Sequence, residues 1–159
     1  MKKIDLGQTI TVLANVGVIA GIVFLGIEVR QNSAQIEQNT IAVAAQAVFE
    51  LNKEANEIRR TLYPDASLTE LIDKGFDDPG SLTEIESLRF DNYFGTVLNT
   101  YEAAWIYRQK GLVEEAEYAG WRDSICGMLQ REGGRSFWES GKTSYADGFI
   151  EDVSGWCLE

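Results

Sequence analysis

The feature that most constrains this fold is an uncharged stretch at residues 6–27, LGQTITVLANVGVIAGIVFLGI. It holds 22 consecutive residues without Asp, Glu, Lys or Arg. As an α-helix it would be roughly 33 Å long, enough to cross the ~30 Å hydrocarbon core of a bilayer. Apart from Thr11, Asn15 and glycines, residues 10–27 are apolar all round, whereas a helix on the surface of a soluble protein has a polar face. The stretch therefore predicts a transmembrane helix.

Two other interpretations of this stretch remain. A cleaved secretory signal has an apolar region of about 7–15 residues followed by a small-x-small cleavage site. Here the apolar region is longer, and the polar sequence EVRQNS follows it without such a site. The second alternative is a helix buried in the core of a soluble protein. The length of the stretch favours an uncleaved membrane anchor over both.

The basic residues on either side of this stretch predict its orientation. Lys2 and Lys3 precede it, whereas Arg30 is the only basic residue that follows it before Lys53. Lys and Arg concentrate on the cytoplasmic side of membrane helices. We therefore expect the N-terminus in the cytoplasm and the body of the chain across the membrane.

Small residues mark one face of the expected transmembrane helix. Gly17 and Gly21 form a G-x-x-x-G pair, and Ala14 and Gly26 add further flat surface. Such a pair lets a second membrane helix approach closely, and Asn15 could donate a hydrogen bond across the contact. The alternative is that the spacing arises by chance, since Gly and Ala are common in membrane helices.

Helical spacing continues after the apolar stretch. Residues 28–63 contain neither Pro nor Gly, and the polar residues 31–40 are typical of a solvated stalk. Apolar residues then recur at steps of three and four, which favours a helix face within a bundle over a free coiled coil: Ala44, Val48, Leu51, Ala55, Ile58 and Leu62. We expect one continuous helix through the span and the stalk, ended by Pro64.

Short patterns divide the rest of the chain into helices. Three positions match helix starts, the first two being capping boxes: Ser67-x-x-Glu70, Ser81-x-x-Glu84 and Ser144-x-x-Asp147. Glycines are expected to end helices: Gly75, Gly111 and the pair Gly133-Gly134. No alternating pattern typical of strands is present.

The sequence thus predicts an all-α fold. A short basic leader (1–5) precedes the transmembrane helix (6–27), which continues into a long stalk that is also the first bundle helix (28–63). A small antiparallel helical bundle (64–159) follows. Its expected core is aromatic, because the four tryptophans occur at helical spacing with other apolar residues.

Charge and composition exclude several functions. The net charge is −11, and since residues 1–27 carry net +1, the remaining body carries −12. A body this acidic repels nucleic acid. The chain has no His, which removes the commonest general base and the commonest transition-metal ligand. We expect no catalytic residues, no cofactor, no metal and no nucleic-acid partner, so the chain is not predicted to be an enzyme.

The best candidate for a polar site is a group on two neighbouring helices: Asn99, Glu102, Arg108, Arg122 and Asp123. Asn99 and Glu102 are three residues apart and share a helix face. If Glu102 were buried beside Trp105, its pKa could rise and it could act as an acid. The interpretation that we favour is a structural cluster that fixes how the two helices pack.

The two cysteines, Cys126 and Cys157, leave two alternatives open. In an oxidising compartment they could form a disulfide that closes a loop of about 30 residues. Otherwise they are two free thiols, with Cys126 buried in a helix and Cys157 near the end of the chain. They cannot form a zinc site without further ligands.

Four segments together carry a resemblance to a known family: GIVFLGIEVRQNSAQI, LTELIDKGFDDPGSL, LRFDNYFGTVLNTYEAAWIYRQKGLVEEAEYAGWRDSI and GGRSFWES. In their order and content they resemble a widespread bacterial family of single-span, membrane-anchored helical-bundle proteins. The surroundings of Trp121-Arg122 and of Gly134-Arg135-x-Phe137-Trp138 are the most distinctive parts. The resemblance implies a bacterial membrane anchor followed by a bundle, and it implies no catalytic residues. With the orientation that Lys2 and Lys3 predict, we expect the protein in the bacterial inner membrane with its body on the periplasmic side.

These observations lead to one expected function and one alternative. We expect a non-enzymatic, single-pass accessory or assembly subunit of a larger membrane complex, whose partners are the lipid bilayer and other transmembrane helices. The alternative is an autonomous membrane-anchored domain that binds or senses a small ligand between its aromatic helices.

Overall fold

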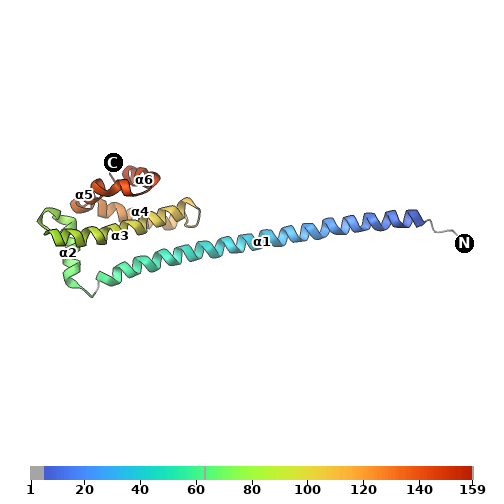
Figure 1. The fold of residues 1–159 in the computed structure, drawn as a ribbon, viewed down its shortest axis with the longest axis horizontal. Helices are drawn as coiled ribbons and strands as arrows, with labels where there is room; N and C mark the ends of the chain where they lie inside the picture. Colours follow the sequence, from blue (N-terminus) through green and yellow to red (C-terminus); the bar gives the residue numbers. More distant parts are fainter. Residues whose placement is uncertain (1–5, 63, 159) are drawn as a thin grey trace. The chain divides into compact units, whose positions relative to one another are not determined.

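The computed structural model describes residues 6–62 and 64–158, and it confirms the all-α prediction, since these residues contain no strand. The expected leader, residues 1–5, lies outside the described residues, as do Tyr63 and Glu159. The helices are α1 (Leu6–Leu62), α2 (Ala66–Asp77), α3 (Glu84–Gln109), α4 (Glu115–Leu129), α5 (Glu132–Gly141) and α6 (Asp147–Cys157), with 3₁₀ turns at Pro79–Ser81 and Lys142–Ser144 (Figure 1).

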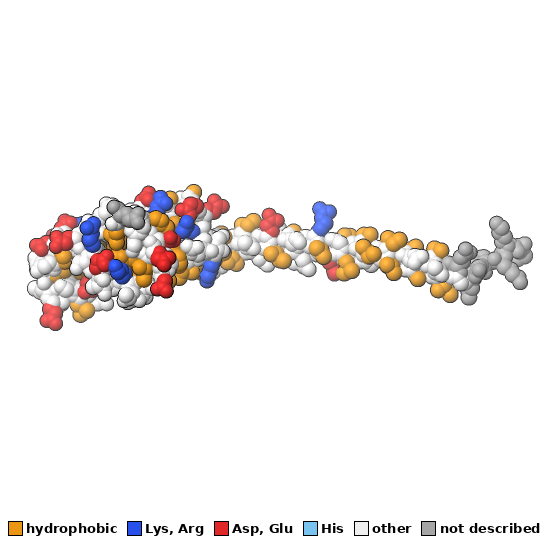
Figure 2. Space-filling model, turned by 90° about the horizontal axis from the view of Figure 1, so that it is seen from above, with side chains coloured by type: hydrophobic (Ala, Val, Ile, Leu, Met, Phe, Trp, Pro, Cys, Tyr) orange, Lys and Arg blue, Asp and Glu red, His pale blue; other side chains and the backbone are white. Residues whose placement is uncertain are grey.

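Helix α1 contains both the expected span and the expected stalk without interruption. By its length and composition it is apolar enough to cross a membrane. The side chains from residue 10 to residue 43 are all exposed, including large apolar ones such as Leu13, Ile22 and Phe24. Figure 2 shows the contrast in side-chain type: charged side chains crowd the bundle, whereas the N-terminal part of α1 carries apolar and uncharged ones.

The chain divides into two units, one that ends at Ala42 and one that begins at Val43. The compact unit therefore includes the last twenty residues of α1, which belong to the segment 28–63 that was expected to be both the stalk and the first bundle helix. Leu51 is 5 % exposed and Ala47 is 6 % exposed. Leu51 is one of the apolar positions that recur at steps of three and four between Ala44 and Leu62. The other five of these heptad-like positions are half-buried, so this face of α1 covers the bundle.

The core of the bundle is aromatic. Phe76 of α2 makes edge-to-face contacts with Phe90 and Phe94 of α3, at ring-centroid distances of 5.1 and 5.0 Å. Trp138 of α5 and Phe149 of α6 are both fully buried and pack edge to face at 6.0 Å. Helix α4 packs against α3, α5 and α6, so the apolar faces of these helices meet around it (Figure 1). Burying each such ring contributes about 1.5–3 kcal/mol.

Three helix caps lie two residues from the expected ones. Helix α2 begins after Asp65, whose carboxylate accepts a hydrogen bond from the Leu68 backbone N–H at 3.0 Å, so Ser67 is not the cap. Helix α3 begins after Thr83, not Ser81, because Pro79–Ser81 forms a 3₁₀ turn and Leu82 is extended. Helix α6 begins after Ala146, and Ser144 ends a 3₁₀ turn instead.

The true capping box of α3 is Thr83 with Glu86. The Thr83 Oγ1 accepts from the Glu86 backbone N–H at 3.3 Å, and the Glu86 carboxylate accepts from the Thr83 backbone N–H at 2.8 Å. We expect Thr83→Ala to lower the free energy of unfolding by about 1 kcal/mol, because the Glu86 backbone N–H loses its side-chain acceptor and the Glu86 carboxylate loses the Thr83 hydroxyl. Urea unfolding of the detergent-solubilised chain, followed by tryptophan fluorescence, measures this loss.

Ser81→Ala is the matched control for that variant. The Ser81 hydroxyl donates to the Asp78 carbonyl at the surface and caps no α-helix, so we expect a change within about 0.5 kcal/mol. The reverse order of the two effects would mean that Ser81, and not Thr83, caps α3.

The sequence pattern predicted that the pair Gly133-Gly134 ends α4, and this prediction is wrong. Helix α4 ends at Leu129, and both glycines lie in the first turn of α5. A Cβ on Gly133 would lie 1.9 Å from the Gly75 carbonyl oxygen, and a Cβ on Gly134 would lie 2.1 Å from the Met128 carbonyl oxygen. These glycines therefore allow α5 to lie directly against the backbones of α2 and α4.

Candidate functional site

The five residues of the expected polar cluster do not gather at one place. Arg108, at the end of α3, makes an ion pair with Glu115 at the start of α4. It lies 3.7 Å from the Asp152 carboxylate of α6, which also accepts a hydrogen bond from the Trp105 indole N–H at 2.8 Å. Arg108 therefore ties three helices together.

The other four residues lie elsewhere. The Glu102 carboxylate accepts a hydrogen bond from the Ala146 backbone N–H at 2.7 Å, so it fixes the start of α6 from α3. Arg122 pairs with its neighbour Asp123 at 3.3 Å, and Asn99 is exposed on α3. Each contact joins backbone or surface groups, and none of them places two acid–base groups around a common point.

A second ionic contact was not anticipated from the sequence. Arg131, at the end of α4, donates to the carboxylates of Asp73 and Asp77 of α2 at 2.7 and 2.9 Å, and its guanidinium lies 4.9 Å from the centre of the Phe76 ring. The hydrogen bond to Asp73 is the main cause of a raised pKa for Arg131. Asp73 and Asp77 are four residues apart, so they share a helix face, but nothing in the sequence links that face to Arg131.

The Arg108 guanidinium also lies over the ring of Tyr118. Tyr118 is 1 % exposed, and the centre of its ring lies 5.1 Å from the Arg108 guanidinium. Burial is the largest influence on the Tyr118 hydroxyl and raises its pKa from 10.0 to about 12, although the Arg108 charge opposes the rise. The folded state therefore holds this proton more tightly than the unfolded state does.

This shift predicts a loss of stability in alkali. Below pH 10 the Tyr118 hydroxyl makes its full contribution to the free energy of unfolding. Between pH 10 and about 12 the unfolded chain loses the Tyr118 proton while the folded chain keeps it, so the free energy of unfolding falls. We expect Tyr118→Phe to lose less stability than the wild type over this range, as measured by urea unfolding at a series of pH values. Equal slopes for the two proteins would contradict the burial of this hydroxyl.

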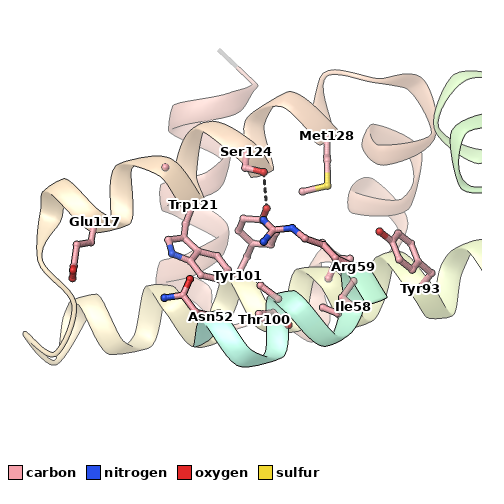
Figure 3. A pocket seen from close by; sticks show the side chains of 13 residues that line it. Asn52, Ile58, Arg59, Tyr93, Thr100, Tyr101, Glu117, Trp121, Ser124 and Met128 are labelled. Atoms are coloured by element: carbon pink, nitrogen blue, oxygen red, sulfur yellow. Dashed lines mark hydrogen bonds between the residues drawn. The ribbon is translucent and has the colours of Figure 1, made fainter. Parts of the chain in front are cut away.

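A cavity of about 340 Å³ lies between the C-terminal part of α1, α3 and α4 (Figure 3). Polar and aromatic side chains line it together, and no sequence pattern groups them in advance. The lining residues that carry its chemistry are Arg59, Tyr93, Tyr101, Glu117, Trp121 and Ser124.

The two cysteines form a disulfide in the structure. Cys126 of α4 and Cys157 of α6 are bonded, with their Cα atoms 4.7 Å apart. Of the two alternatives that the sequence left open, the structure therefore has the disulfide and not the free thiols. Within residues 6–62 and 64–158, no three His, Cys, Asp or Glu side chains are grouped so that they could hold a metal ion.

No protein-family model, curated protein or solved structure matches the chain.

Proposed function

We propose that this chain is a single-pass membrane protein that acts as an accessory or assembly subunit of a larger membrane complex. The observation that carries the proposal is the exposed apolar surface of α1, whose side chains from residue 10 to residue 29 are all open to the surroundings. In water such a surface would be costly at about 25 cal/mol per Å² of apolar area, whereas lipid and neighbouring helices would cover it. The proposal is also in keeping with the family resemblance of the sequence.

The orientation is part of the proposal. Disulfides form in oxidising compartments such as the bacterial periplasm and are rare in the cytosol. The Cys126–Cys157 bond therefore favours a body on the periplasmic side of a bacterial inner membrane. This agrees with the orientation that Lys2 and Lys3 predict, with the N-terminus in the cytoplasm.

The proposed contact with partner helices is the face of Ala14, Gly17 and Gly21. A Cβ added at either glycine would meet nothing within 4 Å, so the face is open. These residues are three and four apart and share one side of the helix. Asn15 is two residues from Gly17 and lies off that side, so it is not expected to donate across the contact.

Replacing the two glycines tests the proposed contact. We expect Gly17→Ile with Gly21→Ile to keep the chain in the membrane but to remove its association with the partner complex, because two branched side chains hold the helices apart. Gly26→Ile is the control: Gly26 was expected to extend the small-residue face, but it lies about 140° around the helix from Gly21 and so is not on that face, and it also has open space around it. Co-purification of the complex with each variant is the measurement, and unchanged recovery with the double variant would remove the main support of the proposal.

A further inference from the structure

The cavity between α1, α3 and α4 contains a single basic side chain, Arg59. Figure 3 shows this side chain reaching into the cavity towards Tyr101. Its Nη1 donates to the Asn56 side-chain oxygen at 3.3 Å, one turn earlier on α1. Among the described residues no carboxylate makes an ion pair with it, although the chain has 25 Asp and Glu residues. Arg59 is exposed and makes this one side-chain hydrogen bond, so its other guanidinium N–H groups are accessible to a ligand in the cavity.

Tyr93, Tyr101 and Ser124 bring hydroxyl groups into the same cavity as this cation. Burial raises the pKa of both Tyr93 and Tyr101, and the positive charge of Arg59 opposes the rise at both, which indicates that the guanidinium lies near the two phenols. Tyr101 donates its hydroxyl hydrogen to the Ser124 Oγ at 2.7 Å. The Ser124 hydroxyl can then direct its own hydrogen at a ligand. A planar guanidinium beside hydroxyl donors is the arrangement that binds a carboxylate with two parallel hydrogen bonds.

The rest of the cavity is suited to an apolar body. Trp121 packs edge to face on Tyr101 with ring centroids 5.4 Å apart, and Val97 and Met128 also line the cavity. An aromatic ring can join such a pair with the same edge-to-face geometry. In Figure 3, Glu117 lies at the opposite end of the cavity from Arg59, with Trp121 between them. The Glu117 carboxylate would repel a second negative charge on the ligand.

We propose that this cavity binds a small organic monocarboxylate with an aromatic body. The carboxylate would lie on Arg59 beside the Tyr93 and Ser124 hydroxyls, and the ring would lie against Trp121. All the residues involved belong to the unit that begins at Val43. The site is independent of the proposed contact at Gly17 and Gly21, so either can fail without the other.

Calorimetric titration of the full chain in a neutral detergent tests this site, with phenylacetate as the probe. We expect phenylacetate to bind with a Kd of about 1 mM or tighter. Phenylacetamide has the same shape without the charge, and we expect it to bind at least about tenfold more weakly. Titrating buffer into the full chain, and phenylacetate into the detergent solution alone, gives the heats of dilution.

Two variants with the same change in net charge complete the test. Arg59→Gln should weaken phenylacetate binding at least about tenfold, because the bidentate contact is lost. Arg60→Gln should leave it within about twofold, since Arg60 is exposed like Arg59 but does not line the cavity. No binding of phenylacetate at about 10 mM, equal binding of phenylacetamide, or equal effects of the two variants would each overturn the proposal.

Discussion

Gly133→Ala is expected to unfold the bundle or to lower its free energy of unfolding by at least about 3 kcal/mol. The added Cβ would lie 1.9 Å from the Gly75 carbonyl oxygen and 3.0 Å from the Phe76 Cα. Both atoms belong to the backbone of α2, so no side chain can rotate away. Helices α2 and α5 would have to separate, and with them the buried rings of Phe76 and Trp138. Since small domains are stable by only about 5–15 kcal/mol in all, this loss is a large fraction.

Gly127→Ala is the matched control, because it makes the same chemical change in the last turn of α4. A Cβ there would meet nothing within 4 Å. Alanine favours a helix over glycine by up to about 1 kcal/mol, so we expect this variant to be equal to the wild type or more stable. Urea unfolding followed by tryptophan fluorescence measures both. A Gly133→Ala variant as stable as the wild type would show that α2 and α5 are not in direct backbone contact.

Loss of the disulfide is the second large effect. The bond joins residues 31 apart and ties α4 to α6. Replacing both Cys126 and Cys157 by Ala should lower the free energy of unfolding by about 3–4 kcal/mol, because the unfolded chain regains the freedom that the closed loop removes. Unfolding curves of the wild type with and without dithiothreitol should differ by a similar amount.

The double Cys→Ala variant provides the control, since dithiothreitol should not change its stability. The number of free thiols in denatured, unreduced protein isolated from membranes gives an independent measurement. We expect none from the Cys126–Cys157 pair, in keeping with a periplasmic body. Two reactive thiols in that sample would contradict both the bond and the proposed orientation.

The sequence predicted α1 well because local information decides it. No Pro or Gly interrupts residues 28–62, and the heptad-like positions face the bundle as expected. The start of α3 was placed wrongly because two overlapping patterns, Ser81-x-x-Glu84 and Thr83-x-x-Glu86, both fit a capping box. The choice between them depends on the 3₁₀ turn at Pro79–Ser81, which the sequence pattern does not specify.

Features that need a second helix could not be predicted. A glycine pair after a helix is the usual sign of its end, and only the approach of Gly75 shows why Gly133 lies inside a helix. Arg108 contacts Asp152 on α6, which lies far along the chain, and no local pattern links the two residues. The cavity with Arg59 likewise depends on three helices, and no local spacing brings Arg59 and Ser124 together.

Gentle detergent extraction of native membranes, followed by purification of this chain with whatever it binds, tests the proposed role as a membrane subunit. We expect the chain to resist a high-salt wash, to occur only in the membrane fraction and to elute in constant proportion with the subunits of one larger complex. Recovery of the chain alone, as a monomer or homodimer, would contradict the accessory role. Recovery in the soluble fraction would contradict the membrane anchor itself.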